Sequence, residues 1–79
     1  MSDDLEKLKG DIALAMGAIG VALGQTLVEL DKRALKILQE KAKAQRAHMT
    51  TIGARDADLM LTTFVGALYD KRFFPQQPE

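Results

Sequence analysis

Apolar residues follow two successive helical stripes along the first part of the chain. The first stripe comprises Leu5, Leu8, Ile12, Met16, Ile19 and Leu23, and the second comprises Leu27, Leu30, Ala34, Leu35, Ile37, Leu38 and Ala42. Spacings of three and four residues belong to one face of a helix, so the pattern predicts helix over about 3–47. The chain has no sustained alternation of apolar and polar residues, so we expect no β-strand.

The phase of the two stripes shifts near Gly24, which leaves two interpretations of the first helix. In one, a single helix continues through Gly24 and is slightly unwound there. In the other, the chain breaks at 24–26, where Gly24 ends one helix and Thr26 with Glu29 forms a capping box for the next. A link of one or two residues is shorter than most helix–helix connections, which favours the continuous helix.

A further helix is expected over about 54–72. The uncharged segment 50–53 contains two threonines and a glycine, which predicts a turn before this helix. Pro75 prevents the helix from continuing. The sequence therefore predicts an all-α fold in a single domain over residues 1–74, followed by a flexible tail over 75–79. The domain is either a long helical hairpin or a three-helix arrangement with a break near Gly24.

Between Ile12 and Val28 the expected helix is apolar on every side. Small residues recur through this segment alternately three and four positions apart, which places them in one line on the helix surface. They are Gly10, Ala13, Gly17, Gly20 and Gly24. The last helix, folded back on the second stripe, leaves the segment from Leu5 to Val28 uncovered, and soluble proteins do not expose so large an apolar surface. We therefore expect a homo-oligomeric helical bundle, in the first place a dimer, that associates through this line of small residues.

Composition and charge narrow the class of protein. The 79 residues contain no Cys and carry a formal net charge of zero, so no global field attracts nucleic acid or membranes. The absence of Cys suits the cytoplasm, and acidic residues before the apolar run do not fit a secretory leader. The apolar run 12–28 is at the short limit for spanning a bilayer, so a single-span membrane peptide stays open as an alternative.

A line of basic residues marks the segment after this run. Lys32, Lys36, Gln39, Lys43 and Arg46 share one helix face. Such a face can lie along phosphates, which makes a small nucleic-acid-binding regulator the second hypothesis. It is equally the ordinary solvated side of an amphipathic helix, and no interleaved aromatic residues are present to stack on single-stranded bases.

Phe73 and Phe74 form the one aromatic cluster, and they either dock on the end of the bundle or present a short peptide to a partner. No arrangement of residues indicates catalysis: His48 is the only histidine, and the glycines do not cluster as in a phosphate-binding loop. We expect no enzyme, metal or cofactor. The favoured hypothesis is a small non-enzymatic regulator, adaptor or inhibitor that acts in the cytoplasm through an unidentified protein partner.

Overall fold

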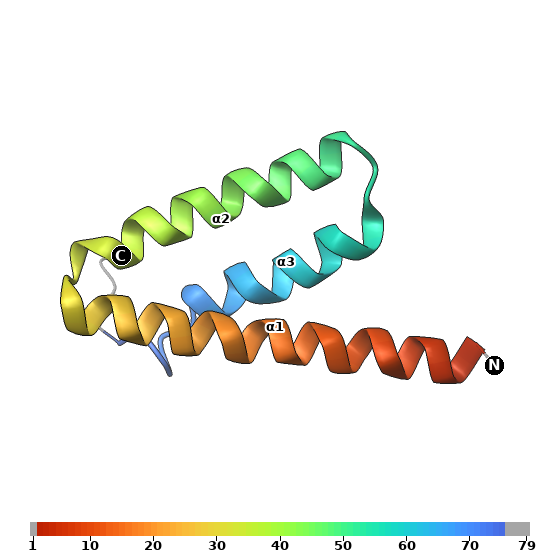
Figure 1. Cartoon of the computed structure of the whole chain (residues 1–79), viewed down its shortest axis with the longest axis horizontal. Helices are drawn as coiled ribbons and strands as arrows, with labels where there is room; N and C mark the ends of the chain where they lie inside the picture. The colour runs from red at the N-terminus through yellow and green to blue at the C-terminus, as the bar shows by residue number, and fades with distance from the viewer. Residues whose placement is uncertain (1, 76–79) are drawn as a thin grey trace.

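The chain folds into three helices joined by short turns (Figure 1). The computed structural model describes residues 2–75, which contain α1 (Ser2–Leu30), α2 (Arg33–Thr51) and α3 (Arg55–Leu68). These residues include no strand, so the predicted all-α class is confirmed for the described part of the chain. The molecule is elongated along α1, with principal extents of 44 × 25 × 20 Å.

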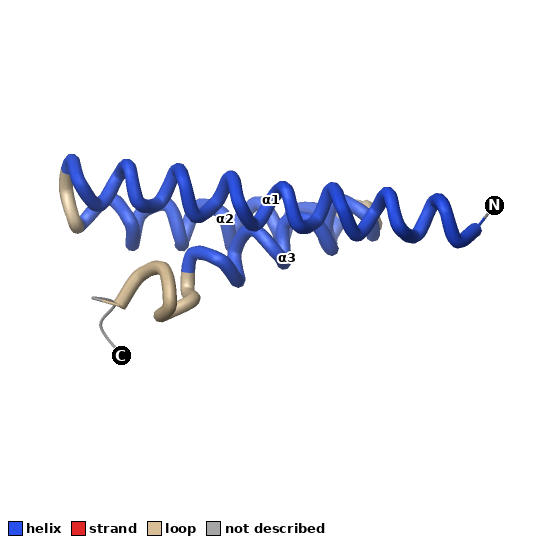
Figure 2. The backbone as a smooth tube through the Cα atoms, turned by 90° about the horizontal axis from the view of Figure 1, so that it is seen from below, coloured by secondary structure: helices blue, strands red, loops and turns tan. Residues whose placement is uncertain are grey.

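α1 and α3 run parallel, and α2 runs antiparallel to both. Lys9 Nζ lies 3.4 Å from Asp56 Oδ1 near the start of α1 and α3, while Gly24 lies beside Leu68 near their ends. α3 contacts α1 and α2 more extensively than those two helices contact each other. Figures 1 and 2 show that the first turns of α1 extend past the α2–α3 turn.

The chain reverses direction at Asp31 and Lys32, and neither predicted course of the first helix is right. The single helix over 3–47 is wrong because Asp31 Oδ1 accepts the Arg33 backbone N–H at 2.9 Å, which stabilises a turn. The break at 24–26 is wrong because α1 continues through Gly24. Thr26 Oγ1 donates to the Ala22 carbonyl at 2.8 Å inside the helix, so its hydroxyl does not cap a new one.

The other helix ends agree in part with the prediction. The turn after α2 contains Gly53 with φ +74°, a conformation that favours glycine, although α2 continues to Thr51 rather than to residue 47. α3 ends at Leu68, not near Arg72, because the Asp70 carboxylate accepts the Arg72 backbone N–H at 2.9 Å and forms another turn. The predicted tail over 75–79 lies outside the described residues from position 76 onward.

The core lies where α3 meets both other helices. Its buried residues come from α2, α3 and the C-terminal turn, with half-buried Met16, Val28 and Leu38 packed around them. They are Leu35, Ala42, Phe64, Val65, Leu68 and Phe74. The expectation that the last helix covers only the second stripe is therefore wrong, since α3 also covers one side of α1.

Candidate interaction surfaces

The glycines expected to mediate self-association lie against other parts of the same chain. A Cβ built on Gly20 would lie 3.2 Å from the carbonyl oxygen of Phe64, and one on Gly17 would lie 3.2 Å from Cγ2 of Thr63. Both distances are tighter than ordinary van der Waals contact. Glycine at these positions therefore allows the backbones of α1 and α3 to approach closely.

Gly24 receives the C-terminal aromatic cluster. A Cβ at this position would lie 2.5 Å from Phe74 Cζ and 3.1 Å from Leu68 Cδ2. Phe74 is 2 % exposed, whereas its neighbour Phe73 is 42 % exposed. The structure thus divides the Phe73–Phe74 pair: the second ring docks on α1 and the first remains at the surface.

The assignment of the small residues to self-association is corrected accordingly. Gly17, Gly20 and Gly24 are occupied by contacts within the chain, because α3 and the C-terminal turn pack on this side of α1. Ala13 is half-buried, and Gly10 has open space around the position of a Cβ. Within this chain, the close approach that the spacing predicts occurs between α1 and α3.

The line of basic residues on α2 faces α3 over much of its length. Gln39 is buried, and its Nε2 donates to the Leu68 carbonyl at 2.9 Å. Lys43 Nζ lies 4.8 Å from the centroid of the Tyr69 ring, which is a cation–π contact. Both residues therefore help to hold the end of α3 against α2.

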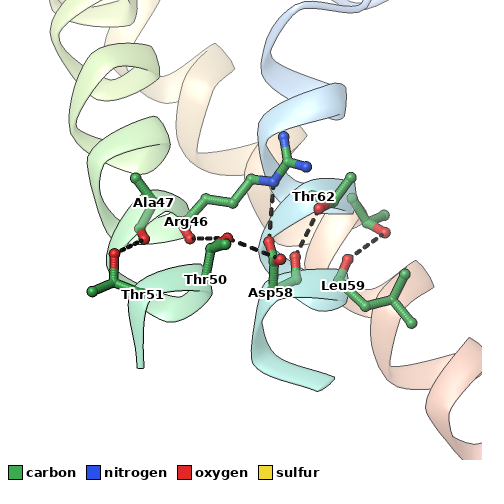
Figure 3. Close-up of polar contacts among 8 residues, drawn as sticks. Arg46, Ala47, Thr50, Thr51, Asp58, Leu59 and Thr62 are labelled. Carbon is green, nitrogen blue, oxygen red and sulfur yellow. Dashed lines mark hydrogen bonds and ion pairs between the residues drawn. The ribbon is translucent and has the colours of Figure 1, made fainter. Parts of the chain in front are cut away.

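Arg46 makes a polar cluster near the α2–α3 turn (Figure 3). Its Nε donates to Asp58 Oδ1 at 3.1 Å, and Thr50 Oγ1 donates to Asp58 Oδ2 at 3.0 Å. All four cations of the line, Lys32, Lys36, Lys43 and Arg46, are exposed. The line is interrupted by the buried Gln39, and its last two cations have partners within the chain, namely Tyr69 directly after α3 and Asp58 on α3.

A repeated tripeptide, which sequence reasoning missed, forms both turns at the ends of α1 and α3. Asp31-Lys32-Arg33 and Asp70-Lys71-Arg72 have the same sequence. In each, the aspartate accepts the backbone N–H of the arginine at 2.9 Å and also binds its guanidinium, with shortest distances of 2.9 Å at Arg33 and 2.7 Å at Arg72. The recurrence of Asp-Lys-Arg after an apolar helix is the signal that could have located the turns.

These contacts shift the pKa values of the aspartate and the arginine in each turn. The side-chain hydrogen bonds from Arg33, followed by its backbone N–H, hold the pKa of Asp31 below its ordinary value. Arg72 lowers the pKa of Asp70 through the same two contacts. The aspartates in turn raise the pKa of both arginines, so each pair stays ionised at neutral pH.

An open groove lies on the side of α1 that adjoins α3 and the C-terminal turn. Its volume is about 400 Å³. The groove is lined by Leu14, Gly17, Ala18, Val21, Thr63, Ala67, Asp70, Arg72 and Phe73. Leu14, which is 72 % exposed, and Phe73 contribute large apolar surfaces, while the Asp70–Arg72 ion pair is the charged part of the lining. The small residues of α1 and α3 leave the space between them.

A second apolar surface lies on a different side of α1. We name it the outer stripe, and its members are Leu5, Leu8, Ile12, Ala15, Ile19 and Ala22. All six are exposed, and they repeat at alternating steps of three and four residues. Leu14 follows Ile12 by two residues and so lies about 200° around the helix, which places this groove residue on a different side of α1, while Ala18 lies between the two surfaces. Nothing within the described chain covers the outer stripe.

The metal-ligating side chains of residues 2–75 do not gather into a candidate metal site. No group of three or more His, Cys, Asp or Glu side chains that could hold a metal ion is found there. His48, the only histidine, is exposed at the end of α2. α1 is long and apolar enough to cross a membrane, a property that core helices and signal sequences share.

Comparison with known proteins gives no match: no family model, no curated protein and no solved structure is similar to this chain.

Proposed function

We propose that this protein is a small non-enzymatic interaction module, acting as a regulator, adaptor or inhibitor through contacts with another protein. The observation that carries the proposal is the groove beside Leu14 and Phe73. Large apolar side chains exposed around a hollow of about 400 Å³ are typical of surfaces that receive a partner's side chains.

The chemistry of the groove points to an amphipathic segment of the partner. The lining includes the small residues Gly17, Ala18 and Ala67, which leave room for apolar anchors. The ion pair of Asp70 with Arg72 offers both a carboxylate and a guanidinium to polar groups at the edge of that segment. We infer an apolar helix or extended peptide with a polar flank, of the kind that docks by a few large side chains.

The alternatives receive less support from the same surfaces. Gln39 is buried, and the exposed Lys43 and Arg46 already contact Tyr69 and Asp58, so nucleic acid bound along this line would compete with contacts inside the chain. A single membrane span through 12–28 would have to separate α1 from α3, because Gly17 and Gly20 pack closely against that helix. We therefore favour the interaction module over both.

Affinity capture from an extract of the source cells tests the proposal. The baits are the wild type, Leu14→Asp, which places a charge in the groove, and Ile37→Asp, a matched apolar-to-charged change on the exposed side of α2. We expect a protein that binds the wild type and Ile37→Asp but not Leu14→Asp, with or without nuclease. Identical capture by all three baits, loss of capture after nuclease, or recovery of the protein only from membranes would overturn the proposal.

A further inference from the structure

The outer stripe has the geometry of a coiled-coil seam. Its six residues alternate in steps of three and four over residues 5–22, which is the spacing of positions a and d in successive heptads. Leu5, Ile12 and Ile19 occupy the a positions, and Leu8 with two alanines occupies the d positions. The intramolecular core uses a different side of α1, so this seam is complete and unpartnered in the single chain.

We propose that a second copy of this chain covers the outer stripe, with the two α1 helices antiparallel. In an antiparallel pair, a positions of one helix face d positions of the other. Leu5 then lies opposite Ala22, and Ile12 lies opposite Ala15, so a large side chain meets a small one in four of the six layers. The other two layers pair Leu8 with Ile19. The stripe thereby complements itself in volume along its whole length.

A parallel pair would pack the same residues less closely. It would place Ala15 against Ala15 and Ala22 against Ala22, and these layers would leave gaps between the bulkier ones. Its one favourable charge contact, between Asp4 and Lys9 of the other copy, adds little because Lys9 already pairs with Asp56 at 3.4 Å. The antiparallel pair also aligns the two helix dipoles favourably.

The charges beside the stripe fit a second copy better than a lipid surface. Asp4 and Asp11 occupy the positions flanking one side of the seam, and in the antiparallel pair they face the uncharged Gln25 and Ala18 of the other copy. Helices that lie on membranes carry Lys and Arg beside the apolar face, whereas aspartates are repelled by anionic headgroups. The seam is therefore suited to protein and poorly suited to anionic membrane.

Cysteine cross-linking tests both the contact and its direction, since the natural chain has no Cys. Residues 5 and 22 of two copies are adjacent in the antiparallel pair, whereas two residues 5 are about 25 Å apart along the axis. A disulfide requires Cα atoms within about 7 Å. We expect a mixture of Leu5→Cys and Ala22→Cys to yield a cross-linked dimer containing one of each, and Leu5→Cys alone to yield none. Cross-linking of Leu5→Cys alone, or no cross-linking at all, overturns the proposal.

Sedimentation equilibrium with matched variants gives an independent measurement. Ile19 is 54 % exposed on the seam and Ile37 is 55 % exposed on α2, so the same Ile→Asp change is made in equivalent settings. We expect Ile19→Asp to raise the dimer dissociation constant at least about tenfold while Ile37→Asp leaves it unchanged. Circular dichroism confirms that both variants remain helical. The proposal is overturned if the two variants change the dimer dissociation constant equally. It is also overturned if the wild type is monomeric at 100 times the protein concentration used in the assay, or if the monomer floats with phosphatidylserine-containing vesicles.

This inference extends the self-association expected of the interaction module and rests on the outer stripe rather than on Leu14 and Phe73, although Ala18 borders both the stripe and the groove. Capture of a partner through Leu14 by a monomeric protein would leave the proposed function standing and remove only the dimer. A cross-linked antiparallel dimer that captures no partner would leave the dimer standing and remove the proposed function.

Discussion

Replacement of Gly24 by alanine tests the docking of the C-terminal turn on α1. A Cβ at this position would lie 2.5 Å from Phe74 Cζ and 2.9 Å from Phe74 Cε1, closer than real Cβ atoms come to their neighbours. Because the ring is the end of a side chain, it can swing away, and the variant keeps its helices. The substitution therefore improves the helix propensity of α1 but displaces the aromatic ring of Phe74.

The two effects have opposite signs and different sizes. Alanine is favoured over glycine inside a helix by about 1 kcal/mol. Exposure of the buried Phe74 ring removes about 1.5–3 kcal/mol of transfer free energy. We expect Gly24→Ala to lower the free energy of unfolding by about 0.5–2 kcal/mol, which for a chain of this size lowers Tm by about 2–16 °C.

Thermal and urea unfolding followed by circular dichroism measure the effect. All variants are compared at one protein concentration, because self-association adds to apparent stability. Gly10→Ala is the matched control in the same helix, since a Cβ there meets nothing within 4 Å. It should raise the free energy of unfolding by up to about 1 kcal/mol.

The sign of the Gly24→Ala effect should reverse once the ring is removed. In a Phe74→Ala background the two closest ring atoms are gone, and Leu68 Cδ2 at 3.1 Å is the end of a flexible side chain that can yield, so the gain in helix propensity dominates. If Gly24→Ala stabilises the wild type as much as Gly10→Ala does, the ring does not rest on α1 and the reasoning is refuted.

Three further predictions concern the polar contacts. Gln39→Leu removes the donor to the last carbonyl of α3 and should lower the free energy of unfolding by about 1–3 kcal/mol in urea titrations; an unchanged value would contradict the buried hydrogen bond. Asp58→Asn should cost at most about 1 kcal/mol, because Arg46 is half exposed, and the difference from wild type should shrink in 1 M salt. Asp31 and Asp70 have lowered pKa values in the folded chain, so their stabilisation is complete above about pH 4 and is lost as the pH falls through the folded values. Between pH 5 and pH 2 the wild type should therefore lose more stability than a chain carrying Asp31→Asn and Asp70→Asn, and equal losses would contradict the lowered pKa values.

The antiparallel dimer and the groove are compatible on one molecule. The outer stripe and Leu14 lie on different sides of α1, and the turn that carries Phe73 is packed beside the groove rather than beside the stripe. A dimer would consequently present two grooves. Such a pair could hold two identical partner segments, which raises effective affinity when the segments belong to one assembly.

The sequence by itself determined the helical class, the turn at Gly53 and the need for close packing along the small residues. Helical class follows from local spacing, because stripes at three and four residues suit only one regular structure. Close packing follows from the repeated glycines, since their helix penalty is offset only where another backbone approaches. These properties depend on residues that are near one another in the chain.

Only the tertiary structure decided which surfaces those residues face. The side of α1 that contains Gly20 is covered by Phe64 and not by another molecule, and the basic line containing Arg46 is directed to Asp58. The first outcome depends on the turns at Asp31 and Gly53, which together bring α3 parallel to α1, and the second depends on the turn at Gly53. A helix pattern specifies the direction of a side chain around its own axis, but the identity of its neighbour is set by where distant turns send the other helices.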